Sequence, residues 1–258
     1  MAHTKKKIFL SQLAAIQAGR REHFFLDQTT SESLSLREAF VEAIWIVSYF
    51  IFRPIFRALG KVEIRYLDPD FDHVRRPIIL MTNHQGMLDP WIISSSLPFA
   101  IFKRLLPIRP YATKRITDKS KLLYWLDKLN FVKIIYYLYD VLILPPKEAS
   151  FDEKLAPSLE ALANHESLIF FPEGGLTLTD EIRPFRRGIV EIQRRTGVPI
   201  LPCTIRYHRH GWIRYHITVT IGQPLFIPEE ILKRRETKQA HFEGSEYLRA
   251  EMVRLYER

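Results

Sequence analysis

Residues 77–89 read PIILMTNHQGMLD and contain the signal that decides the fold. The apolar run 77–81 is short and uninterrupted, which is typical of a strand buried on both faces of a sheet. His84 comes just after this run, and α/β folds gather functional groups where their strands end. If a helix begins near Leu88, the chain can turn back and bring the Asp89 carboxylate to the His84 ring.

His84 and Asp89 form a pair suited to proton transfer. A carboxylate on one imidazole nitrogen fixes the tautomer and leaves the other nitrogen free to accept a proton. No serine or cysteine stands beside His84 in the sequence. We therefore predict that His84 acts as a general base on a substrate hydroxyl, with Asn83 as a supporting residue.

A second motif, FPEGG at residues 171–175, follows another strand-like run. Its glycines let backbone amides approach a ligand closely. We expect Glu173 and Gly174 to support the site. Two roles for Glu173 remain open, because its carboxylate can orient an acceptor hydroxyl or lock the loop through hydrogen bonds. A simple turn with a solvated glutamate is the alternative.

Four basic residues are candidates for binding an anionic substrate: Lys114, Arg183, Arg186 and Arg187. Arginine forms bidentate contacts with phosphate that lysine cannot form. Arg186 and Arg187 also fit a surface that faces lipid headgroups. Lys114 can equally be a solvated lysine.

These motifs, in this order, resemble the lysophosphatidic acid acyltransferase (PlsC-like) family of glycerolipid acyltransferases. The resemblance covers roughly residues 50–225 and also includes FRRG at 185–188 and VPILP at 198–202. It implies transfer of a fatty acyl group from coenzyme A or acyl carrier protein to a lysophospholipid hydroxyl. The leading acceptor is 1-acyl-glycerol-3-phosphate, in phospholipid biosynthesis. Backbone amides from the Gly174 or Pro199 regions, or a nearby basic group, are candidates to stabilise the oxyanion.

One departure from the family pattern bears on the acceptor. The family has an arginine associated with the acceptor phosphate where this chain has Leu176. A different lysolipid or lipid acceptor without a terminal phosphate is therefore an alternative. A non-catalytic membrane lipid-binding homologue is the other alternative, although such a protein gains nothing from an oriented base.

Composition narrows the partners further. The net charge of +9 predicts attraction to anionic partners, among them the anionic leaflet of a membrane and acyl carrier protein. The aromatic content of 12% and the lack of a recognisable nucleic-acid module favour membrane over nucleic acid. The single cysteine, Cys203, is expected to be buried and inert. We predict no bound cofactor and no metal, because basic residues rather than acidic ones or cysteines surround His208, His210 and His216.

We predict one α/β domain with a mainly parallel sheet flanked by helices. The expected division is a polar lead-in at 1–33, a membrane-interfacial helical segment at 34–59, the acyltransferase domain at 60–230 and a charged helical tail at 231–258. The apolar part of the interfacial segment, the ten uncharged residues between Glu42 and Arg53, is too short to span a bilayer, which needs about twenty residues. Its mix of Trp, Tyr, Phe and Arg favours a helix in the membrane interface, and a helix packed on the domain's own core is the alternative. We expect a monotopic protein at the cytoplasmic face.

The periodicity predicts the individual elements as follows. Expected strands cover 62–66, 78–82, 110–113, 141–144, 167–171, 200–207 and 215–221, the last two as a pair joined through His210 and Gly211. Expected helices cover 91–96, 119–129, 150–164 and 189–195. A capping box at Ser150 opens the third of these, and Gly197 ends the fourth.

Overall fold

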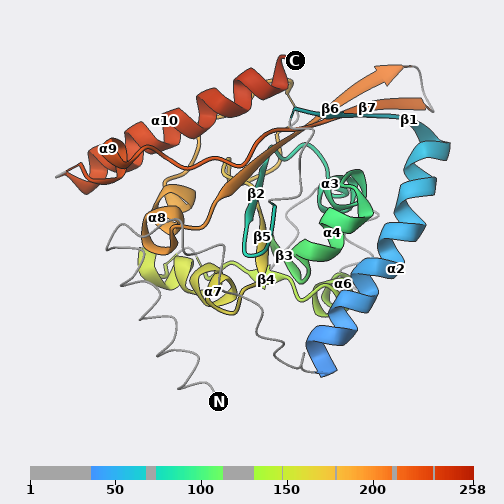
Figure 1. The fold of residues 1–258 in the computed structure, drawn as a ribbon, viewed down its shortest axis with the longest axis horizontal. Coiled ribbons are helices and arrows are strands. Elements are labelled where there is room, and N and C mark those ends of the chain that lie inside the picture. Colours follow the sequence, from blue (N-terminus) through green and yellow to red (C-terminus); the bar gives the residue numbers. More distant parts are fainter. Residues whose placement is uncertain are drawn as a thin grey trace.

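The computed structural model describes residues 36–67, 74–112, 131–146, 148–177, 179–210, 214–234 and 236–258. Within these ranges the strands form one seven-stranded sheet in the order β1-β7-β6-β2-β5-β3-β4, with helices on both faces (Figure 1). The strands are β1 (Gly60–Tyr66), β2 (Ile79–Thr82), β3 (Ile108–Ala112), β4 (Leu142–Ile143), β5 (Ser167–Phe170), β6 (Ile200–His210) and β7 (Arg214–Ile221).

All neighbouring strands are parallel except β6 and β7, which pair antiparallel. The central strand β2 lies between β5 and β6, with Ile79 opposite Leu168 on one side and Ile200 on the other. All four residues of β2 are buried. The prediction of a single α/β domain with a mainly parallel sheet is confirmed.

Two apolar clusters cover the two faces of the sheet, because side chains alternate along each strand. Ile78 and Leu80 belong to the first cluster, whereas Ile79 and Met81 belong to the second. The helices of the first face are α2 (Leu36–Leu59), α3 (Asp89–Ser96), α4 (Phe99–Leu105) and α6 (Phe131–Leu138). Those of the second face are α7 (Phe151–Ala163), α8 (Gly188–Thr196) and α10 (Thr237–Tyr256), preceded by the short α9 (Glu229–Leu232).

Local signals in the sequence set several helix ends as predicted. The Ser150 side chain accepts a hydrogen bond from the Glu153 amide, and the Glu153 side chain accepts one from the Ser150 amide, so the capping box of α7 is present. Gly197 ends α8 in the left-handed conformation, with φ of 66°. Both devices satisfy backbone groups that a helix end leaves unpaired.

Other elements differ from the prediction. Helices α4 and α6 were not predicted from the sequence, and the expected helix at 119–129 lies outside the described residues. The C-terminal segment is helical, and Leu248 and Met252 of α10 are fully buried in the second cluster. The last helix is therefore part of the same core as β2.

The prediction that the apolar helix is too short to span a membrane is wrong. Helix α2 runs without interruption for 24 residues through Arg53 and Pro54. It is the one helix among the described residues that is long and apolar enough to cross a membrane. Arg53 does not end the apolar run, because its guanidinium donates to the carbonyls of Ser95 and Leu97 at 2.8 and 3.1 Å.

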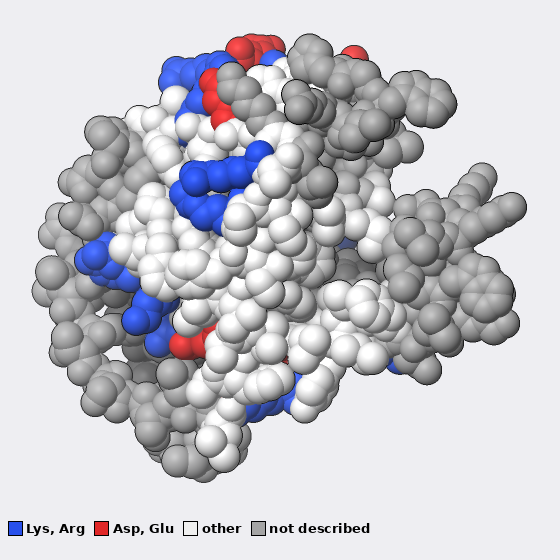
Figure 2. All heavy atoms as spheres, turned by 90° about the vertical axis from the view of Figure 1, so that its right-hand side faces the viewer, with Lys and Arg blue, Asp and Glu red and all other residues white. Residues whose placement is uncertain are grey.

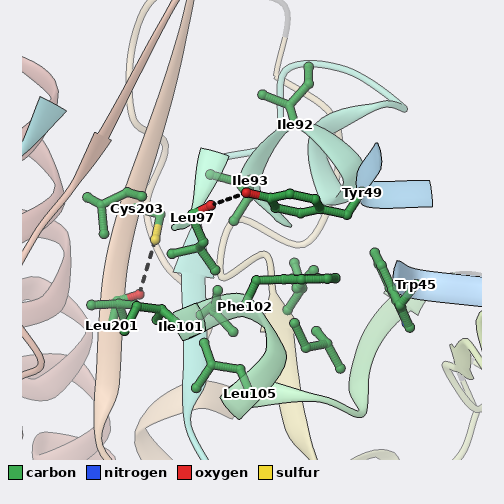
Figure 3. Close-up of a cluster of buried hydrophobic side chains, with 14 of the residues drawn as sticks. Trp45, Tyr49, Ile92, Ile93, Leu97, Ile101, Phe102, Leu105, Leu201 and Cys203 are labelled. Carbon is green, nitrogen blue, oxygen red and sulfur yellow. Dashed lines mark hydrogen bonds between the residues drawn. The ribbon is translucent and has the colours of Figure 1, made fainter. Parts of the chain in front are cut away.

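One side of α2 is packed into the first cluster (Figure 3). Trp45 is 1% exposed, and the Tyr49 ring stacks on Phe102 with the ring centres 4.9 Å apart. The Tyr49 hydroxyl donates to the carbonyl of Leu97 at 3.0 Å. Helix α2 is thus attached to α3 and α4 by buried aromatic contacts along its length.

A buried carboxylate ties α8 to α10. Glu191 is 2% exposed and accepts hydrogen bonds from Arg194, Arg195 and His241 at 2.6 to 2.9 Å. Burial by itself raises the pKa of Glu191, but these donors outweigh burial and lower the pKa to about 2. Because the folded-state pKa lies below the ordinary value of 4.5, the stabilisation is complete above that value.

We therefore expect the free energy of unfolding to fall as the pH is lowered from about 4.5 towards about 2, where Glu191 becomes protonated in the folded state. Glu191→Gln should lose about 2 kcal/mol at neutral pH and show a shallower decline in acid. Urea unfolding at several pH values measures both effects. Glu160→Gln, on the exposed side of α7, is the control. Equal acid slopes for the wild type and Glu191→Gln would contradict this assignment.

Candidate active site

The loop between β2 and α3 holds His84 against a buried carboxylate. Asp89 begins α3 and is fully buried, and its Oδ2 atom lies 2.9 Å from Nδ1 of His84. The same oxygen accepts hydrogen bonds from the backbone amides of Gln85 and Gly86, each at 2.8 Å. A carboxylate in the first turn of a helix is also favoured by the helix dipole. The predicted return of the chain thus brings His84 and Asp89 together.

This geometry sets the protonation pattern of the ring. The Nδ1 atom donates its proton to the carboxylate, so Nε2 carries the lone pair in the neutral imidazole. The His84 ring stacks on Phe171 with the ring centres 3.9 Å apart, and its side chain is 20% exposed. Among the described residues, no serine or cysteine side chain hydrogen-bonds the ring. The arrangement suits a base that acts on a bound molecule.

Tyr207 of β6 completes the environment of the carboxylate and was missed by the sequence analysis. Its hydroxyl donates to Oδ1 of Asp89 at 2.7 Å. Burial and the neighbouring carboxylate raise the pKa of Tyr207, so the hydroxyl stays a donor. A Cβ at Gly86 would lie 2.9 Å from the Tyr207 hydroxyl oxygen, so only glycine allows this close approach. The sequence contains no signal for this contact, because Tyr207 and Asp89 are 118 positions apart.

Asn83 fastens the loop to β6. Its side-chain amide donates to the Ile205 carbonyl and accepts from the Ile205 amide, both at 2.8 Å. Asn83 is 2% exposed. It continues the β2–β6 pairing past the end of β2 and so places the residues that follow it.

Glu173 locks the second motif onto the histidine loop. The carboxylate accepts from the His84 amide at 3.3 Å, the Thr177 hydroxyl at 2.7 Å and the Arg183 amide at 3.1 Å. The residue is 6% exposed, so the alternative of a solvated glutamate is wrong. Gly174 has a φ of 72°, and a Cβ at this position would collide with the Arg186 side chain.

The predicted basic residues have different surroundings. Arg183 is bound to the second motif, since Nε donates to the Thr177 hydroxyl at 2.7 Å and Nη2 donates to the Leu176 carbonyl. Arg186 is exposed and covers Gly174. The Arg187 guanidinium instead lies 4.1 Å from the centre of the Phe151 ring at the start of α7. Lys114 lies outside the described residues.

Of the two predicted sources of oxyanion-binding amides, the Pro199 region lies away from His84, and the Gly174 amide itself is occupied. Pro199 precedes β6, and its carbonyl accepts from the Ile79 amide at the start of β2. It therefore lies at the opposite edge of the sheet from His84, which follows the end of β2. The Gly174 amide donates to the Phe171 carbonyl at 3.1 Å and is already occupied.

Other reactive side chains lie apart from this group. Cys203 is fully buried, and burial raises the pKa of its thiol. The rings of His208 and His216 are 5.2 Å apart, and the side chain of His210 lies outside the described part of the chain. In the described ranges, no three His, Cys, Asp or Glu side chains form a group able to hold a metal ion.

Comparison with known proteins gives consistent matches. A family model described as Acyltransferase matches residues 63–206. The Caenorhabditis elegans protein named "Putative 1-acyl-sn-glycerol-3-phosphate acyltransferase acl-1" is 23% identical over 180 residues, which are 68% of this chain. The match spans 62% of that relative, so this chain covers less than two thirds of its length.

A solved structure shares the fold. The crystal structure of the 1-acyl-sn-glycerophosphate (LPA) acyltransferase PlsC from Thermotoga maritima superposes with a TM-score of 0.54 and 16% identity, and all of both chains is covered. At this identity the likeness concerns the fold alone.

The matched region contains the site described above. The family model covers more than half of the chain, from β1 to the middle of β6. It includes the His84 loop, Asp89 and the second motif at Glu173. The resemblance inferred from the order of the motifs is confirmed, and the chain belongs to the Acyltransferase family.

Proposed function

We propose that this protein transfers a fatty acyl group from a thioester donor to the hydroxyl of a lysophospholipid. The observation that carries the proposal is the His84 ring, whose Nδ1 faces a buried carboxylate at 2.9 Å while Nε2 is left to accept a proton. A base oriented in this way is what attack by a hydroxyl on an acyl carbonyl requires.

The reaction follows from the roles of these atoms. Nε2 of His84 takes the proton of the acceptor hydroxyl as its oxygen attacks the thioester carbonyl carbon. The tetrahedral intermediate then collapses, the carbon–sulfur bond breaks, and the leaving thiolate takes the proton back from the imidazolium. Asp89 stabilises the imidazolium that forms between these steps. The products are an ester and a free thiol.

Direct transfer is favoured over an acyl-enzyme. A covalent route needs a nucleophile in hydrogen-bond reach of the base. Cys203 is buried with its pKa raised, and its sulfur lies 3.7 Å from the Leu201 carbonyl oxygen (Figure 3). The acceptor hydroxyl itself is thus the nucleophile in this proposal.

The leading acceptor is 1-acyl-glycerol-3-phosphate, and the thioester donor is an acyl-coenzyme A or an acylated acyl carrier protein. Arg183 supports a phosphate-bearing acceptor, because its side chain is 48% exposed beside the buried Glu173. Arg186 and, outside the described residues, Lys114 stay candidates for the same role. The name of the Caenorhabditis elegans relative points to the same acceptor.

A second candidate is an acceptor without a terminal phosphate. Leu176 presents an apolar side chain, 36% exposed, where the resembled family has its arginine. The Arg183 guanidinium is committed to the Leu176 carbonyl and the Thr177 hydroxyl. These contacts leave Arg183 fewer donors for a phosphate than a free guanidinium offers.

We also propose that α2 lies in the membrane interface at the cytoplasmic face as a monotopic anchor. Trp45 and Tyr49 are buried against the domain, so lipid cannot surround the helix while it stays packed there. Its outer side exposes Val47, Phe50 and Ile51, at 54, 59 and 49%. Exposed Phe99 of α4 and Ile134 of α6 belong to neighbouring helices of the same face.

Figure 2 shows this side of the molecule, on which uncharged side chains form a broad area with basic side chains beside it. An exposed apolar face of this kind marks an interaction surface. Basic residues near it would add attraction to an anionic leaflet.

His84→Ala should lower the rate of acyl transfer by about 10²–10⁴-fold, which is the usual contribution of a general base. The assay uses purified full-length protein, labelled long-chain acyl-coenzyme A or acyl carrier protein, and lysolipids with and without a terminal phosphate. Circular dichroism confirms that the variant is folded. If the wild type transfers to no acceptor from either donor, the non-catalytic lipid-binding alternative holds instead.

Tyr207→Phe should lower kcat by about tenfold or more, with little change in KM for the donor. The hydroxyl positions the carboxylate that orients His84, and a hydrogen bond to a charged group contributes about 1.5–3 kcal/mol. Tyr247→Phe on α10 is the matched control. An unchanged kcat in Tyr207→Phe, or an equal fall in the control, would remove Tyr207 from the positioning role.

The double variant Val47→Ser/Ile51→Ser should bind vesicles at least tenfold more weakly than the wild type, because it removes about 1.5–3 kcal/mol of buried apolar contact per side chain. Co-sedimentation with vesicles containing an anionic phospholipid measures this. Phe242→Ser is the control, because Phe242 is 70% exposed but belongs to α10 on the other face. Equal loss in the control variant would contradict an anchor formed by α2.

A further inference from the structure

A basic cavity lies on the other face of β6 from Tyr207. Side chains alternate along a strand, so Tyr207 points to the α3 side while its neighbour Arg206 points to the α10 side. The cavity measures about 90 Å³, more than a single water molecule needs. Its lining includes three arginines and three threonines from β1, β6, β7 and the end of α10: Arg65, Arg206, Arg258, Thr204, Thr218 and Thr220.

The hydroxyls of two of these threonines form no hydrogen bond with the described protein. Thr204 and Thr220 face each other across the β6–β7 pair and are 2 and 3% exposed. Among the described residues, neither hydroxyl has a hydrogen-bond partner. Both line the cavity, so an occupant of the cavity is what would satisfy them.

The arginine side chains of the cavity are held in place by their contacts, and carboxylates neutralise only part of their positive charge. Arg65 bonds Glu63 at 2.8 Å and the Arg258 carbonyl, while Glu63 also lies 3.4 Å from His216. The Arg206 guanidinium lies 4.1 Å from the centre of the Tyr256 ring. No carboxylate among the described residues pairs with Arg206 or with the Arg258 guanidinium.

Hydroxyls and guanidinium groups that converge on one small space are donors suited to an anion with several acceptor oxygens. Arginine matches the geometry of phosphate in particular. The other polar groups of the lining are the ring of His208, whose Nε2 lies 3.3 Å from the Thr218 hydroxyl oxygen, and the Tyr256 hydroxyl. The size of the cavity fits one phosphate group rather than a whole nucleotide.

A chain of hydrogen bonds joins the cavity to the His84 loop. The Gln85 side chain donates to the Tyr256 hydroxyl at 3.1 Å, and the Gln85 backbone amide donates to Asp89 at 2.8 Å. Tyr256 is 7% exposed, and the Arg206 guanidinium lies over its ring. An anion held by Arg206 would thus lie one side chain away from the loop that orients the base.

We propose that this cavity, lined by Arg65, Arg206, Arg258 and the unpaired hydroxyls of Thr204 and Thr220, is a phosphate-binding site separate from the His84 group. The identity of the molecule that carries the phosphate rests on the proposed function. It is the thioester donor, through its phosphorylated part, or a lipid, through its headgroup. Binding of phosphate itself requires no acyl transfer.

The first test is binding of inorganic phosphate to the full-length protein, measured by isothermal titration calorimetry against chloride at the same ionic strength. Arg206→Met should bind phosphate at least tenfold more weakly, because one guanidinium is lost while the alkyl packing on Tyr256 is kept. The control is Arg37→Met, since Arg37 also lies over a tyrosine ring, that of Tyr137. Equal affinity in Arg206→Met and the wild type, or no preference for phosphate over chloride, would overturn the proposal.

The hydroxyls give a second and independent test. Thr204→Val and Thr220→Val should weaken phosphate binding, yet the melting temperature without phosphate should not fall, because neither hydroxyl forms a hydrogen bond with the described protein. A lower melting temperature together with unchanged phosphate affinity would mean that the hydroxyls serve the fold instead.

Competition with bound phosphate identifies its source. Coenzyme A that competes better than its analogue lacking the 3′-phosphate assigns the site to that group of the donor. Competition by glycerol 3-phosphate alone assigns it to a headgroup, and competition by neither assigns it to free phosphate. Each of these outcomes requires a phosphate site. The competition can be measured with the His84→Ala protein as well, so its result does not depend on whether the protein transfers acyl groups.

Discussion

The fully buried carboxylate of Asp89 is the group on which the rest of the site depends. An ionised carboxylate removed from water is costly unless hydrogen bonds compensate it. Four donors do so here: the His84 ring, the amides of Gln85 and Gly86, and the Tyr207 hydroxyl. Because Tyr207 belongs to β6, the compensation requires the β2–β6 register that the Asn83 side chain continues beyond the end of β2. The orientation of the His84 ring therefore depends on the correct pairing of the central strands β2 and β6.

The alternation of side chains along β6 divides the molecule into two environments. On the α3 side, Tyr207 reaches the buried carboxylate, and farther out α2 presents exposed apolar side chains (Figures 1 and 2). On the α10 side, Arg206 stacks on Tyr256 in a basic cavity. Gln85 connects the two, since it bonds Asp89 through its backbone and Tyr256 through its side chain. The His84–Asp89 pair and the basic cavity are thus connected through one loop.

Local signals predicted much of the fold, and the error in the length of α2 has a long-range cause. The apolar run before His84, the capping box at Ser150 and the glycine after α8 are short-range devices, and each formed as expected. The extent of α2 was misjudged because Arg53 was read as the end of an apolar run. In the structure the Arg53 guanidinium is satisfied by carbonyls some forty positions away, and only the folded chain brings them near.

By itself the sequence determined which residues are candidates for the chemistry and where they stand relative to strand ends, because these depend on residue type and spacing along a few positions. It predicted His84, Asp89 and the second motif, as well as the family. Only the tertiary structure decided that Tyr207 donates to Asp89 and that Glu173 is sealed between loops. It alone also gathers Arg65, Arg206 and the threonines in one cavity. These contacts join strands far apart in the chain, and their energies arise from burial and hydrogen bonding that no local pattern specifies.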